Sequence, residues 1–406
     1  MSIDERYKYL YRMQPRYLKA TRKERGLLLT EMEAYTGLHR KSLIRLMKGD
    51  LERRPRTRER AKTYGPDVLA AIRVIWKSLD QPCAERLTPN LVWMAKHLVA
   101  HDELEVSSTV LEQLSTISIS TVERRLQHLR QDQPRLQRRR SRTPNPALAG
   151  VPMGRIAWDV QEPGHMEADT VHHCGPSASG EYVHTVQLVD VATGWCERRA
   201  TLGRSYIVME DAFRNILKRL PFPICELHPD NGSEFFNNHL RRFWDDVVKH
   251  VQLSRSRPYH KNDNPFVEQR NANPVRAYLG YDRLDTVAQT LAVNVLYDHM
   301  WLYHNFFQPV MRTVEKPVVS VRGQRTRIRR RRDQARTPFD RLCEKGVLSP
   351  DDQARLIERR DQTNPIHLLR QINKQLEHIF SLPCRTPDQP ECIYDTLSEI
   401  PDPRPE

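Results

Sequence analysis

The 406-residue sequence lacks the marks of several large protein classes. No stretch approaches the ~18 consecutive apolar residues of a membrane-spanning helix, which excludes such a span. Residues 1–13 contain no apolar core, so we expect no secretory signal. The seven cysteines are odd in number, scattered and without a CxxC pair, which argues against a disulfide framework and a sequence-evident zinc site. We therefore expect a protein of the reducing cytosol.

The charge is strongly positive and unevenly distributed. The chain has 65 Lys and Arg against 51 Asp and Glu, a net charge of +14. Residues 1–150 carry 30 basic and 17 acidic side chains, residues 151–310 carry 16 and 19, and residues 311–406 carry 19 and 15. A basic region most often binds nucleic acid, although a solvated basic surface has the same composition.

The first basic region contains apolar residues at helical spacing on both sides of Gly37. A helix, a short glycine-containing turn and a second helix are the layout of a helix-turn-helix motif. We assign residues 1–62 to this DNA-binding domain; an ordinary helical hairpin with a basic outer face is the alternative. The second helix carries four candidate DNA contacts to phosphates or guanine edges: Arg40, Lys41, Arg45 and Lys48.

A second helical DNA-binding unit is predicted over residues 63–136. Its helices are expected near 67–79, 88–100 and 109–130. Ser120, with Glu123 three residues later, predicts a capping box at the start of the last helix. That helix would present Arg124 and Arg125 to DNA. Residues 137–155 then form a basic linker.

Residues 156–305 change to strands that alternate with helices. The expected strands cover 164–172, 181–191, 195–201, 223–228 and 251–256. The expected helices cover 205–220, 234–248, and a segment capped by Asn264 that carries Glu268. This order predicts an α/β core with a mixed five-stranded sheet and helices on its faces.

Three carboxylates occupy positions that this strand order can bring to one edge of the sheet. Asp169 lies on the first strand, Asp230 at the end of the fourth, and Glu268 on the following helix. Clustered carboxylates need a compensating cation, and hard oxygen ligands select Mg²⁺ or Mn²⁺. Two such ions can activate an attacking oxygen and stabilise a leaving one in phosphoryl transfer. We expect Asp169 to bridge both ions, with Asp230 on one and Glu268 on the other.

Other acids and a possible zinc site compete with this interpretation. Glu167 lies on the same strand face as Asp169 and is an alternative ligand. Asp190 is expected to cap the turn at Thr193-Gly194, and Asp263 to cap a helix or contact DNA. Residues 172–174 (His-His-Cys) suggest zinc, but neighbours on a strand point to opposite faces, so we expect a role at the hairpin end.

Three sequence strings resemble one known family. They are MEADTV around Asp169, HPDNGSEF around Asp230, and SRPYHKNDNPFVEQ around Glu268. They resemble the catalytic core of DDE transposases and retroviral integrases, bacterial insertion-sequence transposases above all, over roughly residues 155–305. The resemblance implies an RNase H-like fold, Mg²⁺ dependence, cleavage of DNA 3′ ends and strand transfer. It also implies that Asp169, Asp230 and Glu268 are the metal-binding acids.

The resemblance extends to DNA contacts, with departures. Lys261, Asn262 and Asn264 lie in the loop before Glu268, where we expect contact with substrate phosphates rather than simple solvation. The family often has 35 residues between the last two acids, against 37 here. It commonly has Lys or Arg seven residues after the glutamate, where this chain has Val275, with Arg276 one residue further. Pro274 falls inside the expected helix and should kink it.

Residues 306–406 are expected to form a basic, mostly helical C-terminal region. Residues 322–336 contain eight arginines, which favours DNA binding over a solvated tail. Amphipathic helices are expected at 349–360 and 364–380, the second packing locally through Leu368, Ile372 and Leu376 rather than between subunits. The last twenty residues are expected to be disordered.

The combined sequence hypothesis is a multimeric DDE transposase that binds double-stranded DNA, namely element terminal inverted repeats and target DNA. We expect a bacterial, cytoplasmic and nucleoid-associated enzyme. Two alternatives stay open: a catalytically dead, transposase-derived DNA-binding regulator, suggested by Pro274, and an RNase H-type structure-selective nuclease.

Overall fold

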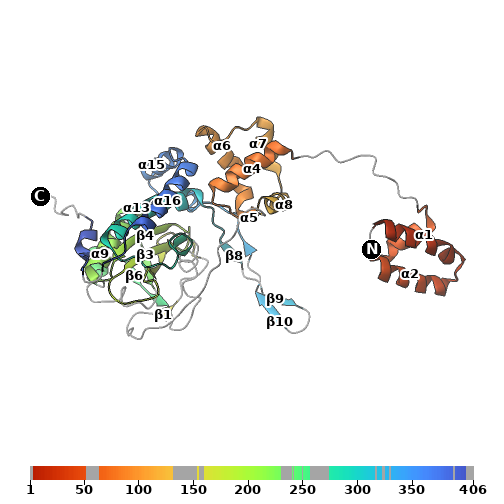
Figure 1. Cartoon of the computed structure of the whole chain (residues 1–406), viewed down its shortest axis with the longest axis horizontal. Coiled ribbons are helices and arrows are strands. Elements are labelled where there is room, and N and C mark those ends of the chain that lie inside the picture. Colours follow the sequence, from red (N-terminus) through yellow and green to blue (C-terminus); the bar gives the residue numbers. More distant parts are fainter. Residues whose placement is uncertain are drawn as a thin grey trace. The chain divides into compact units, whose positions relative to one another are not determined.

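The computed structural model describes residues 3–51, 64–130, 153–154, 160–229, 240, 242–248, 250–256, 274–315, 318–321, 325–328, 331–386 and 389–398. The chain divides into two compact units, Met1–Thr63 and Tyr64–Glu406 (Figure 1). Among the described residues, no helix has both the length and the apolar character needed to cross a bilayer.

The first unit is a three-helix domain. Its helices are α1 (Ile3–Lys19), α2 (Arg22–Thr36) and α3 (Arg40–Lys48). Helices α2 and α3 were expected from the sequence, whereas α1, which supplies Leu10, Met13 and Tyr17 to the shared core, was not. The unit therefore buries the apolar faces of all three helices against one another.

Local sequence sets the ends of α2. The Thr21 side chain accepts a hydrogen bond from the Glu24 backbone, and the Glu24 carboxylate accepts one from the Thr21 N–H at 2.8 Å. At the other end Gly37 adopts φ +66°, a left-handed conformation that suits glycine, and donates its N–H to the Glu33 carbonyl. The expected glycine turn between the two helices is confirmed.

Helices also open the second unit. They are α4 (Pro66–Ser78), α5 (Ala84–Leu87), the short 3₁₀ helix η1 (Thr88–Asn90), α6 (Leu91–Ala100), α7 (Ser108–Thr116) and α8 (Ile119–Arg130). The expected cap at Ser120 is wrong, because α8 begins at Ile119 and Ser118 Oγ accepts the Thr121 N–H. The apolar residues of these helices belong to the same core as the sheet; for example, the Tyr303 hydroxyl donates to the Ser78 carbonyl at 2.7 Å.

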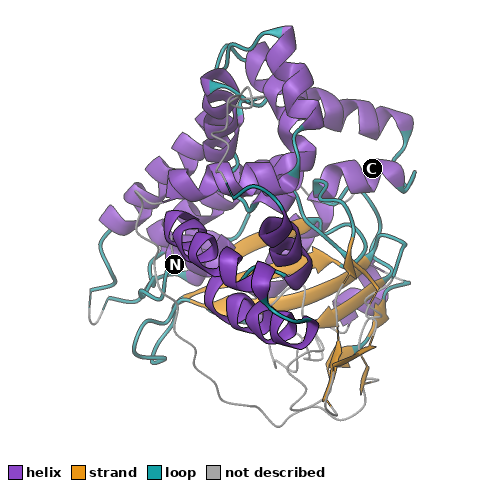
Figure 2. Ribbon diagram, turned by 90° about the vertical axis from the view of Figure 1, so that its right-hand side faces the viewer, coloured by secondary structure: helices purple, strands orange, loops and turns teal. Residues whose placement is uncertain are grey.

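The predicted mixed five-stranded sheet is confirmed. Its strands are β2 (His165–His172), β3 (Val183–Asp190), β4 (Cys196–Leu202), β5 (Glu226–Pro229) and β6 (Gln252–Leu253). The spatial order is β4-β3-β2-β5-β6, with β2, β3 and β4 antiparallel and with β5 and β6 parallel to β2. A separate parallel pair joins β1 (Met153–Gly154) to β7 (Arg255–Ser256). Figure 2 shows the strands in orange.

Helices cover the sheet, and every residue of β3 is buried. Helix α9 (Tyr206–Arg219) packs against β4, as does α13 (Val287–Leu302), which continues into the π-helical segment η4 (Tyr303–Phe307). Another π-helical segment, η2 (Phe243–Val248), lies within the expected helix 234–248. Residues 234–239 and 241 of that helix, and residues 264–273 of the helix expected to carry Glu268, fall outside the described residues.

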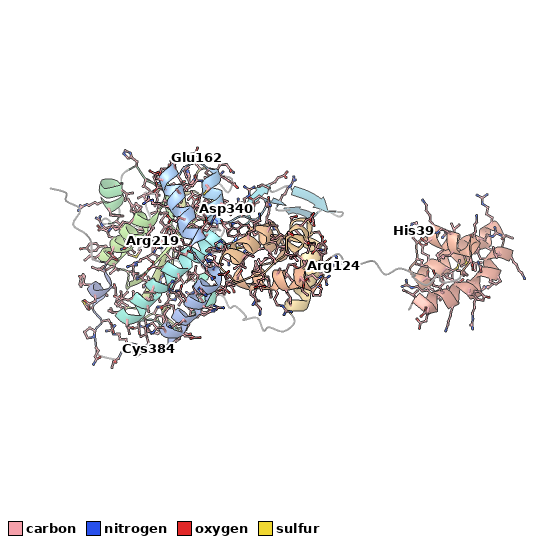
Figure 3. The ribbon with its side chains drawn as sticks, turned by 90° about the horizontal axis from the view of Figure 1, so that it is seen from above. His39, Arg124, Glu162, Arg219, Asp340 and Cys384 are labelled. Carbon is pink, nitrogen blue, oxygen red and sulfur yellow. The ribbon has the colours of Figure 1, made fainter. Side chains whose placement is uncertain are left out.

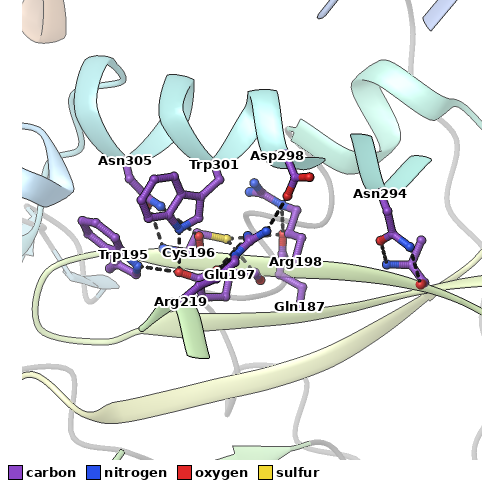
Figure 4. Close-up of polar contacts among 11 residues, drawn as sticks. Gln187, Trp195, Cys196, Glu197, Arg198, Arg219, Asn294, Asp298, Trp301 and Asn305 are labelled. Carbon is purple, nitrogen blue, oxygen red and sulfur yellow. Dashed lines mark hydrogen bonds and ion pairs between the residues drawn. The ribbon is translucent and has the colours of Figure 1, made fainter. Parts of the chain in front are cut away.

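Two asparagines cover the edge of the sheet at β4 (Figure 4). Asn294 accepts from the Ala200 N–H at 2.8 Å and donates to its carbonyl at 3.1 Å. Asn305 does the same at Cys196, at 2.9 and 3.0 Å. These amides make the backbone hydrogen bonds that a neighbouring strand would make. Helix α13 and segment η4 therefore cover an edge strand that could otherwise pair with another chain.

The C-terminal region differs from its mostly helical prediction. Residues 313–332 contain two antiparallel pairs, β8 (Thr313–Glu315) with β11 (Arg331–Arg332) and β9 (Val318–Val321) with β10 (Arg325–Ile328). Helices α14 (Pro338–Glu344), α15 (Pro350–Asp361) and α16 (Pro365–Ser381) follow, and α16 packs locally on α13, as expected.

Part of the tail expected to be disordered is packed on the sheet. A 3₁₀ helix, η5 (Ile393–Thr396), lies there. Glu391 accepts from the Val287 N–H at 2.9 Å, and the Ser398 hydroxyl accepts from Arg199 at 2.8 Å. These contacts tie the tail to α13 and β4, which are remote in sequence.

Candidate functional site

Asp169 lies on the central strand of the sheet. Its side chain is half-buried, Oδ1 accepts the Thr170 N–H at 2.8 Å, and its cross-strand partner on β3 is Gln187. On the other side, Ala168 pairs with Pro229, the last residue of β5. Asp230 is the next residue in the chain. Asp230 and Glu268 themselves lie outside the described residues.

Arg276 is the first residue of α12 (Arg276–Leu279), and its side chain lies near Asp169. Its guanidinium donates to the His172 carbonyl at 2.8 Å and to the Gly280 carbonyl at 3.1 Å, and it lies over the Tyr281 ring. Burial lowers the pKa of Arg276, and the negative charge of Asp169 is among the influences that oppose this shift. Pro274 and Val275 form the π-helical turn just before α12 and are buried. The proline therefore begins this helical segment within the described residues.

Glu167, the alternative ligand, is more deeply placed than Asp169. It is fully buried, and its cross-strand partner on β5 is the fully buried His228. Burial lowers the pKa of nearby Arg312 to about 10, while the charges of Asp190 and Glu167 act to raise it. Among the acids of β2, Asp169 is thus the one whose side chain reaches solvent.

Asp190 caps the turn, as the sequence analysis expected. It accepts hydrogen bonds from the Gly164 N–H at 2.9 Å, the Thr193 N–H at 2.7 Å and the Thr193 hydroxyl at 2.6 Å. Burial raises the pKa of this carboxyl, although the hydrogen bonds act against the shift. Its oxygens hold the β3–β4 connection together.

The His-His-Cys segment likewise has a local role. His172 Nδ1 lies 3.2 Å from the Tyr182 hydroxyl, and His173 Nε2 lies 2.8 Å from Thr185 Oγ1. Within the part of the chain that the structure describes, no three His, Cys, Asp or Glu side chains form a metal-binding group. That part includes residues 172–174 but not Asp230 or Glu268. All seven cysteines lie among the described residues, and none of them forms a disulfide bond there.

Two buried histidines predict a pH-dependent stability. Burial lowers the pKa of His173 and of His184 to about 3. The unfolded chain therefore binds more protons than the folded one below the ordinary histidine pKa, so stability is full above about pH 6.5 and falls as the pH decreases from there toward 3. For two such groups, urea unfolding should show a loss of about 2–3 kcal/mol between about pH 7.5 and about pH 5.5.

His184→Phe is the matched variant. The His184 ring stacks on Tyr182, and its buried Nδ1 has no hydrogen-bond partner among the described residues, so phenylalanine keeps the stacking and breaks no hydrogen bond seen at that nitrogen. Removing one of the two titrating rings should roughly halve the loss. An unchanged pH dependence in this variant would show that other groups control it.

The residues expected to contact DNA have different surroundings. Lys41, Arg45 and Lys48 are exposed on α3, whereas Arg40 donates to Thr30 Oγ1 and to the Gly26 carbonyl and so ties α3 to α2. His39 caps the start of α3 (Figure 3).

The arginines of α8 also differ from each other. Arg124 is exposed (Figure 3), whereas Arg125 donates to the Tyr64 carbonyl at 3.3 Å. Lys261, Asn262 and Asn264 fall outside the described residues.

Three residues of this region were missed by the sequence analysis. Glu226 and His228 on β5, and Ser254 just after β6, are joined by hydrogen bonds. Ser254 is 26 residues from His228, and only the pairing of β5 with β6 brings them together. The position of His228 two residues before Asp230 was the one available signal.

The chain was compared with protein-family models, solved structures and protein sequences. No protein-family model matches it. The structure is similar to the catalytic core domain of BIV integrase, with 14% identity and TM-score 0.30 over 45% of this chain and 95% of that one. It is also similar to the HTLV-2 integrase catalytic core domain in complex with magnesium, with 16% identity and TM-score 0.27 over 36% and 90%.

A sequence relative is much nearer. The "Uncharacterized protein y4rM" of Sinorhizobium fredii (strain NBRC 101917 / NGR234) is 34% identical over 308 residues. The matched region covers 76% of this chain and 87% of the relative. The chain belongs to the family of the Sinorhizobium fredii protein y4rM.

Proposed function

We propose that this protein is a DDE-type transposase with an RNase H-like core, which cleaves DNA 3′ ends and transfers them to target DNA. The observation that carries the proposal is the parallel pairing of β2 with β5. Ala168 lies opposite Pro229, and the next residue of each segment is an aspartate, Asp169 and Asp230. Because consecutive Cα atoms are about 3.8 Å apart, this register favours two neighbouring carboxylates.

The donor chemistry fits a hard divalent cation. Asp169 offers a half-exposed carboxylate beside the end of β5, and Asp230 and Glu268 are the other proposed ligands. Carboxylate oxygens suit Mg²⁺ or Mn²⁺, and a pair of these ions would supply charge stabilisation for the attacking and leaving oxygens of phosphoryl transfer. The proposed role of the three acids is to hold this charge beside the DNA phosphate.

Arg276 has a proposed supporting role. Its contacts with the His172 carbonyl hold α12 against the end of β2, and its positive charge lies near Asp169. We infer that Arg276 positions this edge of the sheet, and that any contact it makes with a DNA phosphate is additional.

DNA recognition is assigned to the first unit. Lys41, Arg45 and Lys48 are exposed on one short helix after a glycine turn, an arrangement that suits groove binding. Replacing all three by alanine should lower DNA affinity and flatten the slope of log K against log salt by about 0.9 for each phosphate that the variant no longer neutralises. Fluorescence anisotropy at several salt concentrations measures both quantities.

The control for this variant carries three alanines on α1, at Lys8, Arg12 and Lys19, which are also exposed. It removes the same charge from the same unit. Equal losses of affinity in the two variants would mean that the net charge of the unit, rather than α3, binds DNA.

A joining assay tests the proposed function. The full chain is incubated with Mg²⁺, a plasmid and labelled duplexes taken from the DNA flanking its gene. We expect joining of the flanking 3′ ends to the plasmid, and joining requires that two ends meet, so we also propose a multimer. Specific binding without joining under Mg²⁺ or Mn²⁺ would identify a DNA-binding regulator instead. Cleavage that ignores the end sequence would identify a structure-selective nuclease.

A further inference from the structure

A chain of hydrogen bonds crosses three strands behind the proposed site. His228 Nδ1 lies 2.6 Å from Ser254 Oγ, and Ser254 Oγ donates to Glu226 Oε1 at 2.5 Å. The other oxygen of Glu226, Oε2, lies 2.8 Å from His165 Nδ1 on β2. His228 and Ser254 are buried, and Glu226 and His165 are half-buried. One carboxylate therefore links β2, β5 and the end of β6.

The direction of each hydrogen bond follows from the number of protons available. A serine hydroxyl has a single hydrogen, and here it is donated to the Glu226 carboxylate. Ser254 Oγ can then only accept from His228, so His228 carries its proton on Nδ1. In the neutral ring the remaining nitrogen, Nε2, is a hydrogen-bond acceptor.

Within this group of hydrogen-bonded residues, His228 lies nearest in strand register to the proposed acids. It pairs with Glu167 on β2, two residues before Asp169, and it stands two residues before Asp230. Residues two apart on a strand share a face of the sheet. The Nδ1 edge of the ring is turned to Ser254, just after β6, and β2 is the neighbour of β5 on the other side.

We propose that Glu226 and Ser254 fix the tautomer and orientation of His228, and that His228, through Nε2, positions the ends of β2 and β5 from which the proposed catalytic acids arise. This inference rests on the proposed function. All three are positioning residues, because none is placed on the DNA or on a metal. Comparable supporting hydrogen bonds at metal sites change activity or metal affinity by about 10–100-fold when removed.

Substitutions of His228 and Ser254 separate positioning from packing. His228→Asn keeps a donor near the place of Nδ1 and lacks Nε2, whereas Ser254→Thr keeps the hydroxyl. We expect strand transfer to fall by about 10–100-fold in His228→Asn and in Ser254→Ala, with a higher Mn²⁺ concentration for half-maximal rate. Ser254→Thr should restore the rate. Ser205→Ala is the matched control, since the Ser205 side chain makes no capping hydrogen bond to α9 within the described part of the chain.

A second readout does not depend on activity. Nitrogen-15 NMR of the full chain should show His228 protonated on Nδ1 in the wild type, and a mixture of tautomers in Ser254→Ala. Wild-type joining activity that persists in His228→Asn would overturn the positioning role alone. If the wild type joins no DNA, the proposed function fails, and an Nε2–H tautomer in the same protein would separately overturn the hydrogen-bond assignment.

Discussion

Asp169→Asn should abolish metal-dependent strand transfer while leaving DNA binding intact. The substitution preserves the size of the side chain and removes the negative charge that would hold the cation. A bound metal contributes several kcal/mol to the transition state of phosphoryl transfer, so a loss of about 4 kcal/mol would slow joining by about 10³-fold. DNA affinity should change little, since the proposed DNA contacts of the first unit lie on another part of the chain.

Asp298→Asn is the matched control for this experiment. Asp298 is exposed on α13, where it pairs with Arg219 at 2.6 Å, and its substitution makes the same chemical change outside the proposed site. Joining by this control should stay close to that of the wild type. Full activity in Asp169→Asn would exclude Asp169 as a ligand, whereas equal losses in both variants would point to a general effect of the removed charge.

Glu197→Ala should lower the free energy of unfolding of the second unit far more than the loss of an exposed carboxylate would. The Glu197 carboxylate is fully buried beneath α13 (Figure 4). Its Oε1 accepts from the indole N–H groups of Trp195 at 2.9 Å and Trp301 at 2.6 Å, and its Oε2 accepts from Arg219 at 3.1 and 2.8 Å. Alanine would leave these donors without their acceptor and the guanidinium without one of its two carboxylates.

Breaking one side of a buried ion pair costs about 3–5 kcal/mol, and urea unfolding of the purified chain measures the loss. The control is Glu210→Ala on α9, which removes a half-exposed carboxylate from an ion pair with Arg214. An exposed pair of this kind contributes about 0.3–0.5 kcal/mol. A small effect of Glu197→Ala, similar to that of the control, would contradict the importance assigned to this network.

The core sheet was predictable because its strands differ from their surroundings in pattern. Residues 181–191 form an apolar, β-branched segment next to turn residues, and they became the wholly buried β3. The helix expected at 205–220 became α9 for a similar reason, since its apolar residues recur on one face. By contrast, α1 was missed because Pro15 and many charged residues obscure its periodicity.

The sequence did not indicate which remote residues would contact one another. Asn294 and Asn305 cover β4 through amide groups whose partners are about a hundred residues away. The composition of the arginine-rich segment 322–336 favoured DNA binding and indicated no strand, yet residues 325–328 pair with 318–321. Side-chain hydrogen bonds between remote residues leave no periodic signal.

The proposed site was partly predictable. Asp169 was correctly placed on the first strand of the sheet, and the end of β5 lies beside it. The roles of Asp169, Asp230 and Glu268 stay predictions, as do those of Lys261, Asn262 and Asn264. The support from His228 and Ser254 depends on strand register, which the sequence does not specify by itself.

The most direct measurement replaces Asp230 by cysteine and compares strand joining in Mg²⁺ and Mn²⁺. A thiolate is a soft ligand that binds Mg²⁺ poorly and transition metals better. If Asp230 holds the metal beside Asp169, the Asp230→Cys variant should be inactive in Mg²⁺ and regain joining in Mn²⁺, while the wild type works in both. Joining by the variant that is equally fast in both metals would contradict metal binding by Asp230, and with it the proposed catalytic site.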